Sequence, residues 1–180
     1  MVEIKNVQVF GLERTIKASG NSYAVGEIDT LQPITDRDLK RAKMLGSSKL
    51  GHQSHDSFLK GVIVQFDIKY PQYWTPEAQR YHWLEIIQSE SKMHRLTVQA
   101  NSDNFEEQFN KYVDKDMIER VQLYASQYNS CEKLDKYYYF MKTLSNLPMG
   151  YELWETVTTN YLQLKTIYTQ RKGHMLKEDW

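Results

Sequence analysis

The sequence predicts one α+β domain, rich in helices, with a small and mostly antiparallel sheet. Its 180 residues are about the length of one domain and carry no internal repeat. Segment 61–70 alternates apolar and polar residues as a half-buried strand does, while segments 114–128 and 133–144 place apolar residues at helical spacing. We therefore expect a single domain over residues 1–180.

The first third of the chain predicts a short strand, a loop and a helix. Residues 7–10 (VQVF) are typical of a strand. Segment 20–35 holds Gly20, Asn21, Gly26 and Pro33 and is expected to be a loop. Helix-start chemistry follows at Thr35-Asp36-Arg37-Asp38, and Gly46-Ser47-Ser48 is expected to end that helix.

The strongest strand signal, GVIVQFDIKY at 61–70, is terminated by Pro71. Thr75 and Pro76 have the chemistry of a helix cap and a first helical position, which predicts a helix from there to about Ile86. A last helix is expected over roughly 152–172.

Composition excludes several classes of protein. Lys+Arg and Asp+Glu number 23 each, so the net charge is zero and a sequence-independent nucleic-acid binder is not expected. No apolar run approaches the roughly 20 residues of a membrane span, and the first residues lack a signal-peptide pattern. The one cysteine, Cys131, can form neither an internal disulfide nor a cysteine zinc site, so we expect no metal and a cytoplasmic location.

Three constellations of polar residues could carry chemistry. Asn160 and Arg171 are eleven residues apart, which places them about 16 Å apart on one face of a helix, with Leu164 and Ile167 between them. Such a pair suits a long ligand with separate polar groups. An ordinary amphipathic helix with two polar edge residues is the alternative interpretation.

The second constellation runs from Gln79 to Arg95 and combines cations, imidazoles, amides and hydroxyls, which bind phosphates and a pyrimidine edge well. Its alternative is a half-buried helix edge followed by a polar strand. The third comprises Ser54-His55-Asp56-Ser57-Phe58 and Arg14-Thr15-Ile16-Lys17-Ala18-Ser19. For these two segments a helix cap and a solvated helix face, respectively, are the alternatives.

Together these segments, in this order, resemble the flavin-dependent thymidylate synthases (ThyX). That family carries a Leu-Pro step before a helix with Asn and Arg at this spacing, and an Arg-His-Arg signature that continues to Ser, Asn-Glu, Ser and Arg. His82 and Ser91 match the signature, and Gln88 stands for its Asn. The sequence departs from the signature at five positions. Tyr81 and Trp83 replace the two arginines, and Ile86, Ser89 and Met93 replace the first Ser, the Glu and the final Arg. The positive charge that is missing is expected to come from Arg80, His94 and Arg95.

The resemblance implies a ThyX-like fold and reductive methylation of dUMP to dTMP, with FAD as cofactor and NADPH and methylenetetrahydrofolate as co-substrates. It implies a homotetramer with sites shared between chains, and no protein nucleophile. It assigns Arg171 to catalysis and to the nucleotide. The cofactor residues would be His82, Gln88, Asn160, His55, Ser57 and Ser19, and the substrate residues Ser89, Ser91, Arg95, Arg80 and Arg171.

Two alternatives remain open. Each charge-assisted hydrogen bond lost from the Arg-His-Arg signature contributes roughly 1.5–3 kcal/mol, so losing two could weaken flavin binding by two to four decades. The chain would then be a flavin- or nucleotide-binding relative without synthase activity. A helical interaction protein is the other alternative, since one fold can serve unrelated functions.

Overall fold

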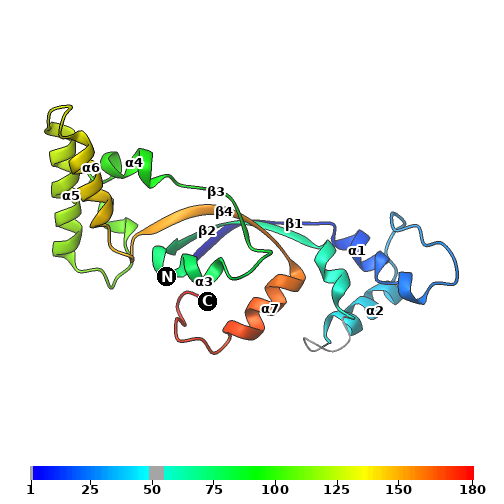
Figure 1. Cartoon of the computed structure of the whole chain (residues 1–180). Helices are drawn as coiled ribbons and strands as arrows, with labels where there is room; N and C mark the ends of the chain where they lie inside the picture. The colour runs from blue at the N-terminus through cyan, green and yellow to red at the C-terminus, as the bar shows by residue number, and fades with distance from the viewer. Residues whose placement is uncertain (1, 49–54) are drawn as a thin grey trace.

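A long antiparallel sheet forms the centre of the molecule, and helices gather at its two ends (Figure 1). The computed structural model describes residues 2–48 and 55–180. The four strands lie in the order β1-β2-β4-β3, with bounds Glu3–Phe10, Ile63–Pro71, Glu152–Asn160 and Glu85–Ser89. The α+β class with a small antiparallel sheet is therefore confirmed.

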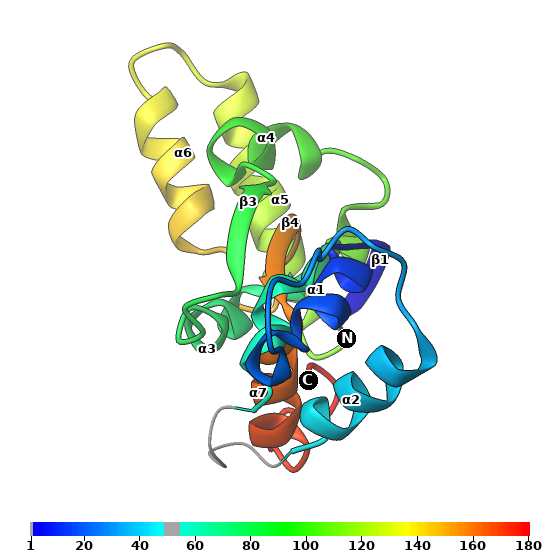
Figure 2. The same ribbon diagram turned by 90° about the vertical axis from the view of Figure 1, so that its right-hand side faces the viewer.

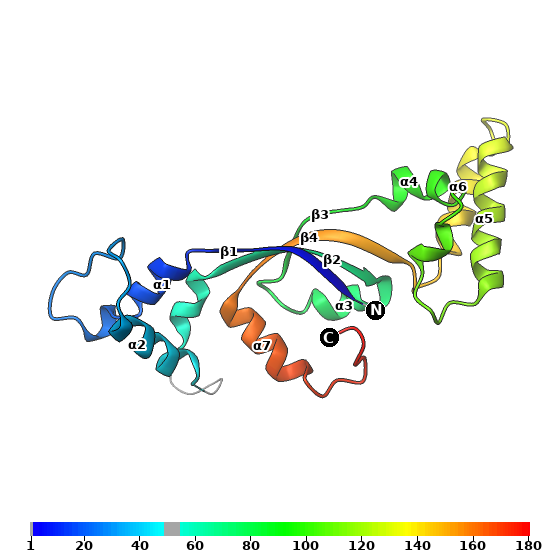
Figure 3. The same cartoon turned by 180° about the vertical axis from the view of Figure 1, so that it is seen from behind.

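The helices form three groups around this sheet. At one end lie α1 (Leu12–Ala18) and α2 (Asp36–Gly46), which face the viewer in Figure 2. At the other end lie α4 (Lys92–Gln99), α5 (Lys115–Ser130) and α6 (Lys136–Ser145). One side of the sheet carries α3 (Thr75–Ala78), α7 (Tyr161–Arg171) and the C-terminal segment, as Figure 3 also shows. Short 3-10 turns are η1 (Asn21–Tyr23), η2 (Ser57–Gly61), η3 (Gln72–Trp74) and η4 (Phe105–Gln108).

The central core follows from the alternation in β2. Val64, Phe66 and Ile68 are buried on the side that faces α7, and they pack with Trp74 and the half-buried Leu164. The intervening polar residues of β2 point to the opposite side, as strand geometry requires. The strand predicted at 61–70 is thus confirmed.

A second core lies among the helices at the far end of the sheet. Ile118 and Val121 of α5 are buried there, which confirms the helix predicted at 114–128. The ring of Tyr151 is fully buried and packs edge-on against Phe109 at a centroid distance of 5.3 Å. The tyrosine-rich helix predicted at 133–144 begins at Lys136.

At the α1–α2 end of the sheet, a capping box determines where α2 begins. The Thr35 side chain accepts from the Asp38 backbone N–H while the Asp38 side chain accepts from the Thr35 N–H, a complete capping box. The helix start predicted at Thr35 is confirmed. Gly11 joins β1 to α1 with φ 73°, and a Cβ there would lie 2.8 Å from the Gly61 carbonyl oxygen, so the turn requires glycine.

Two helix predictions are wrong in part. The helix expected to reach Ile86 ends at Ala78, and residues 85–89 form β3 instead. The helix expected at 152–172 is strand β4 up to Asn160 and helix only from Tyr161. In both cases pairing decides the outcome, because β4 hydrogen-bonds to β2 on one side and to β3 on the other. Its Thr-Val-Thr-Thr run also favours a strand over a helix.

Candidate functional site

Ser19, His55 and Ser57, from two distant segments, line one cavity of about 420 Å³. We call it the α1–η2 cavity, because Ser19 follows α1 and Ser57 begins η2. Its remaining lining is Ala18, Asn21, Ser22, Tyr23, Leu45 and Phe58. Ser19 is buried, whereas His55 and Ser57 are exposed. Three predicted cofactor residues therefore meet at the α1–α2 end of the sheet.

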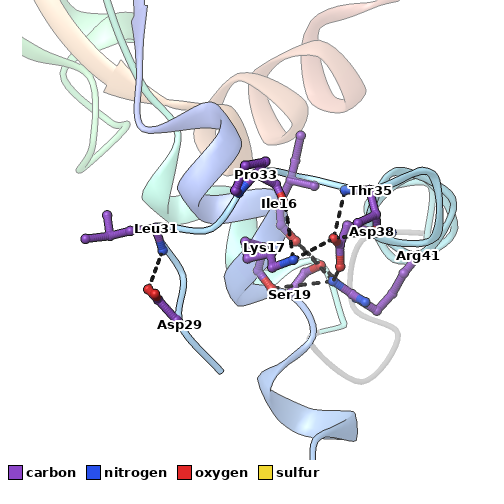
Figure 4. Close-up of polar contacts among 9 residues, drawn as sticks. All are labelled: Ile16, Lys17, Ser19, Asp29, Leu31, Pro33, Thr35, Asp38 and Arg41. Atoms are coloured by element: carbon purple, nitrogen blue, oxygen red, sulfur yellow. Dashed lines mark hydrogen bonds and ion pairs between the residues drawn. The ribbon is translucent and has the colours of Figure 1, made fainter. Parts of the chain in front are cut away.

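A polar network holds Ser19 in this cavity (Figure 4). The Ser19 hydroxyl donates to the Ile16 carbonyl at 2.6 Å and accepts from Arg41 Nε at 3.1 Å. Asp38 forms ion pairs with Arg41 at 2.7 Å and with Lys17 at 3.1 Å. Hydrogen bonds from the Thr35 hydroxyl and then from Arg41 hold the pKa of Asp38 well below its usual range. Asp38 stays ionised and fixes two cations beside the cavity.

Sequence reasoning missed Asp38 and Arg41 as neighbours of Ser19. The capping box at Thr35 and the three-residue spacing of Asp38 and Arg41 predict a local pair on α2, but only the packing of α2 against α1 shows that this pair reaches Ser19. The interpretation of segment 14–19 as a solvated helix face is correct for Arg14, which is exposed, and wrong for Ser19, which is buried.

Asp56 does not cap a helix. It precedes η2, but its side chain makes no capping hydrogen bond. Its carboxylate instead pairs with Lys165 Nζ at 2.6 Å, and the same ammonium group donates to the Gly46 carbonyl at 3.0 Å. The ion pair ties α7 to η2 and to the end of α2, so the capping interpretation of Asp56 is wrong. Ser54 lies outside the described residues.

A second set of candidates meets at the junction of β3 and α4. Gln88, Ser89, Ser91 and Arg95 line a cavity of about 410 Å³, which we call the β3–α4 cavity. Ser91 caps α4 by accepting from the His94 N–H at 3.3 Å. The other lining residues are Lys5, Asp67, Glu90, Trp154, Glu155 and Thr156.

Charges of both signs surround the β3–α4 cavity. Lys5 Nζ lies 3.5 Å from the ring centroid of Trp154, so an indole holds this cation in place. Hydrogen bonds from Asn6 and then Thr156 lower the pKa of Asp67. Burial raises the pKa of Glu155, whose carboxylate accepts from the Tyr70 hydroxyl. The cavity offers donors and acceptors suited to a polar ring edge, and sequence reasoning missed Lys5 and Trp154 in it.

Arg171 lies apart from both cavities, in a cluster on the α7 side of the sheet. Its Nε donates to the Tyr81 hydroxyl at 2.7 Å, and its Nη2 donates to Glu77 at 2.8 Å. The guanidinium carbon lies 4.4 Å from the Trp180 ring centroid, and the Arg171 side chain is only 13% exposed. Arg80 pairs with Glu77 at 3.6 Å and is largely exposed.

Asn160 lies at the opposite end of α7 from Arg171, as the spacing predicts. It is 5% exposed and caps the helix, accepting from the Gln163 N–H at 2.9 Å. His82 is exposed on the turn before β3. Because α1 and α4 lie at opposite ends of the sheet, the three groups of candidates do not converge within one chain (Figure 1).

Within residues 2–48 and 55–180 the structure gathers no group of three or more His, Cys, Asp or Glu side chains that could hold a metal ion. In the same part of the chain, no helix has both the length and the apolar character needed to cross a bilayer.

Comparison with known proteins adds a structural likeness. No protein-family model and no curated protein matches this sequence. The ThyX of Helicobacter pylori, crystallised with FAD and dUMP, has the same fold, with a TM-score of 0.66 at 16% identity over 99% of this chain and 87% of that chain. A second structure of that enzyme with FAD and dUMP gives 0.65 at 16% identity over 98% and 87%. The UMP/dUMP methylase PolB of Streptomyces cacaoi, bound to 5-Br dUMP, gives 0.55 at 14% identity over 91% and 74%. The chain therefore has a ThyX-like fold.

Proposed function

We propose that this protein is a flavin-dependent thymidylate synthase-like enzyme, which binds FAD and dUMP and catalyses reductive methylation of dUMP to dTMP. Methylenetetrahydrofolate would supply the carbon and NADPH the reducing equivalents. The observation that carries the proposal is the meeting of Ser19, His55 and Ser57 in one cavity of a ThyX-like fold. Ser19 lies more than thirty residues before His55 and Ser57 in the chain, and the fold brings the two segments together.

The α1–η2 cavity is the proposed flavin-binding region. Its polar groups fit part of such a cofactor: the Ser57 hydroxyl and the His55 imidazole would donate to phosphate or ring oxygens, while the Ser19 hydroxyl, whose proton goes to the Ile16 carbonyl, would accept from a ring N–H. At about 420 Å³ the cavity holds a portion of FAD and not the whole molecule. The flavin would supply the redox chemistry, while the protein binds, orients and polarises.

The β3–α4 cavity is the proposed nucleotide-binding region. Ser91 and Arg95 suit a phosphate, and the Gln88 amide can both donate to and accept from a pyrimidine edge. The resemblance assigns Gln88 to the flavin, but Gln88 lies in this cavity, at the opposite end of the sheet from the α1–η2 cavity. A flavin that meets the nucleotide here would be held by the α1–η2 cavity of a neighbouring protomer. Three carboxylates line this cavity, those of Glu155, Glu90 and Asp67. Because they would repel a phosphate, the pyrimidine ring edge would lie on their side of the cavity.

A second copy of the chain would complete the site. Arg171, Arg80 and His82 lie away from both cavities. In a closed symmetric homotetramer, a neighbouring protomer could bring these residues to the nucleotide. Arg171 would then stabilise negative charge that develops on a uracil carbonyl.

One observation favours a second candidate, a nucleotide-binding relative without turnover. Arg171 already donates from Nε to the Tyr81 hydroxyl and from Nη2 to Glu77, and its guanidinium lies over the Trp180 ring. If those contacts persist in the assembly, the protein would bind dUMP and lack the proposed catalytic cation.

The test is turnover with FAD, NADPH, methylenetetrahydrofolate and dUMP, with dTMP measured by mass spectrometry. We expect dTMP from the wild type and at least tenfold less from Ser91→Ala, a loss of about 1.4 kcal/mol. Ser126→Ala, an exposed serine on α5, is the matched control and should retain full activity. Binding of dUMP without any dTMP would support the second candidate. Absence of both binding and turnover would overturn the proposal.

A further inference from the structure

Lys5 of β1 lines the β3–α4 cavity together with Arg95 of α4, although the two residues come from distant parts of the chain. The Lys5 ammonium nitrogen lies 3.5 Å from the centroid of the Trp154 ring, and Trp154 lines the same cavity. This contact places the charged end of Lys5 at the cavity, and not its backbone alone. Lys5 is exposed, so its ammonium group is accessible to a ligand.

The ammonium group of Lys5 has donors to spare. Within residues 2–48 and 55–180, Lys5 forms no ion pair. Asp67 is its cross-strand neighbour on β2, but the two Asp67 carboxylate oxygens accept from Asn6 at 2.6 Å and from Thr156 at 2.7 Å. An ammonium group carries three donors and no acceptor, and contact with an indole face leaves donors for an oxygen atom of a ligand.

The surroundings of Lys5 favour an uncharged acceptor over a phosphate. The Asp67 carboxylate lies opposite Lys5 in the strand pairing, and Glu90 also lines the cavity. Both carboxylates would repel a phosphate that approached Lys5. A carbonyl oxygen carries no net charge and can accept from the ammonium group beside them. Ser91 and Arg95 remain the groups suited to the phosphate.

Together with two neighbours, Lys5 matches the edge of a uracil ring, which presents a carbonyl oxygen, an N–H and a second carbonyl oxygen. Lys5 supplies one donor, and the exposed Gln88 amide supplies another. Glu90 supplies the acceptor, because only one of its carboxylate oxygens is engaged, by the Trp154 N–H at 3.2 Å. Cytosine carries an amino group where uracil carries the O4 oxygen. An ammonium group cannot accept from that amino group.

We propose that Lys5 selects uracil over cytosine by donating from its ammonium group to the O4 oxygen of the bound pyrimidine. This inference rests on the proposed function, since it requires that the β3–α4 cavity bind dUMP. Lys5 would give the cavity a cation at the ring edge from within one chain, whereas Arg171 is engaged by Tyr81 and Glu77.

The experiment is calorimetric titration of the full-length protein with dUMP and with dCMP. Lys5→Met keeps an apolar stem against Trp154 and removes the donors. Lys5→Gln replaces the ammonium group with an amide, which can also accept from an amino group. Lys142→Met is the matched control, because the Lys142 ammonium lies 4.5 Å from the Tyr124 ring, on α6 and outside the cavity. The melting temperature of each variant separates a change in stability from a change in base preference.

We expect the wild type to bind dUMP at least 10-fold more tightly than dCMP. Lys5→Met should reduce this ratio by about 10-fold or more, the effect of one hydrogen bond from a charged group. Lys5→Gln should also narrow the ratio, through tighter binding of dCMP, and Lys142→Met should leave it unchanged.

A wild type that binds dUMP with a ratio unchanged in both Lys5 variants would overturn the role of Lys5 and leave the proposed function standing. A lower melting temperature at an unchanged ratio would have the same meaning, because it would show a structural role alone. An equal loss of preference in Lys142→Met would likewise overturn the role of Lys5. If the wild type binds neither nucleotide at ~1 mM, the proposed function and the role of Lys5 both fall.

Discussion

Removal of the Tyr70 hydroxyl should destabilise the protein strongly. The Tyr70 hydroxyl donates to the Glu155 carboxylate, and the two residues are 2% and 8% exposed. Burial, followed by the hydrogen bond to Glu155, raises the pKa of Tyr70, so the hydroxyl remains a donor at every accessible pH. Tyr70→Phe keeps the ring against Trp74 and leaves a buried carboxylate without this donor.

A hydrogen bond to a charged group contributes about 1.5–3 kcal/mol. In a chain of this length that loss corresponds to a fall of roughly 3–12 °C in melting temperature. The measurement is urea denaturation at pH 7, compared with Tyr137→Phe, whose ring is 75% exposed. The control should change the free energy of unfolding by no more than about 0.5 kcal/mol. Equal effects of the two substitutions would refute the assignment of Tyr70.

The hydrogen-bonded pair of Tyr70 and Glu155 also predicts that the free energy of unfolding depends on pH. Burial raises the pKa of Glu155 above the unfolded value of 4.5, with the hydrogen bond from Tyr70 opposing part of that rise. The folded state then binds the Glu155 proton more tightly than the unfolded state does. The resulting contribution to the free energy of unfolding is present below the unfolded pKa and is lost as pH rises through the folded pKa. Glu155→Gln removes the titration. The wild type should lose stability relative to Glu155→Gln between acid and neutral pH, and a relative gain would contradict the argument.

Three further predictions concern Arg171, Asp38 and the assembly of the protein. Arg171→Lys keeps the charge but loses the planar fork that joins Tyr81 and Glu77. We therefore expect weaker dUMP binding and a melting temperature ~2–5 °C lower, both measured by calorimetry. If dUMP affinity and melting temperature are both unchanged, Arg171 is not part of the site. Asp38 has a lowered pKa, so its contribution is present above the unfolded pKa of 3.8 and is lost as pH falls through the folded one. Asp38→Asn should therefore lower the urea midpoint at pH 7, and the size of this effect should shrink steadily as the pH falls below 3.8. Light scattering should report a homotetramer at micromolar concentration, and a monomer would count against shared sites.

The parts of the fold that could be predicted are those with local signals. The capping box at Thr35 needs only four residues, and the alternation in β2 needs only ten. The helix expected to reach Ile86 could not be corrected locally. Ile86 lies in β3 because its backbone pairs with Val157, more than seventy residues later. Such pairing is invisible to a pattern read over a short window.

The residues of the candidate site likewise divide into those with a local sequence signal and those without one. Ser19, Ser57 and Ser91 could be selected because the short segments that hold them resemble motifs of the ThyX family. Arg41 and Trp154 could not, since each reaches its cavity only through the packing of a distant element. Sequence spacing placed Asn160 and Arg171 at the two ends of α7, but it could not show that Glu77 and Trp180 engage the arginine.

Titration of the purified protein with FAD, followed by dUMP, tests the central claim most directly. We predict that the protein takes up FAD at ~100 µM or below, and that dUMP then changes the flavin absorbance. His55→Ala should weaken the uptake, and Ser126→Ala should leave it unchanged. A protein that stays colourless after exposure to ~100 µM FAD and shows no response to dUMP would contradict the account.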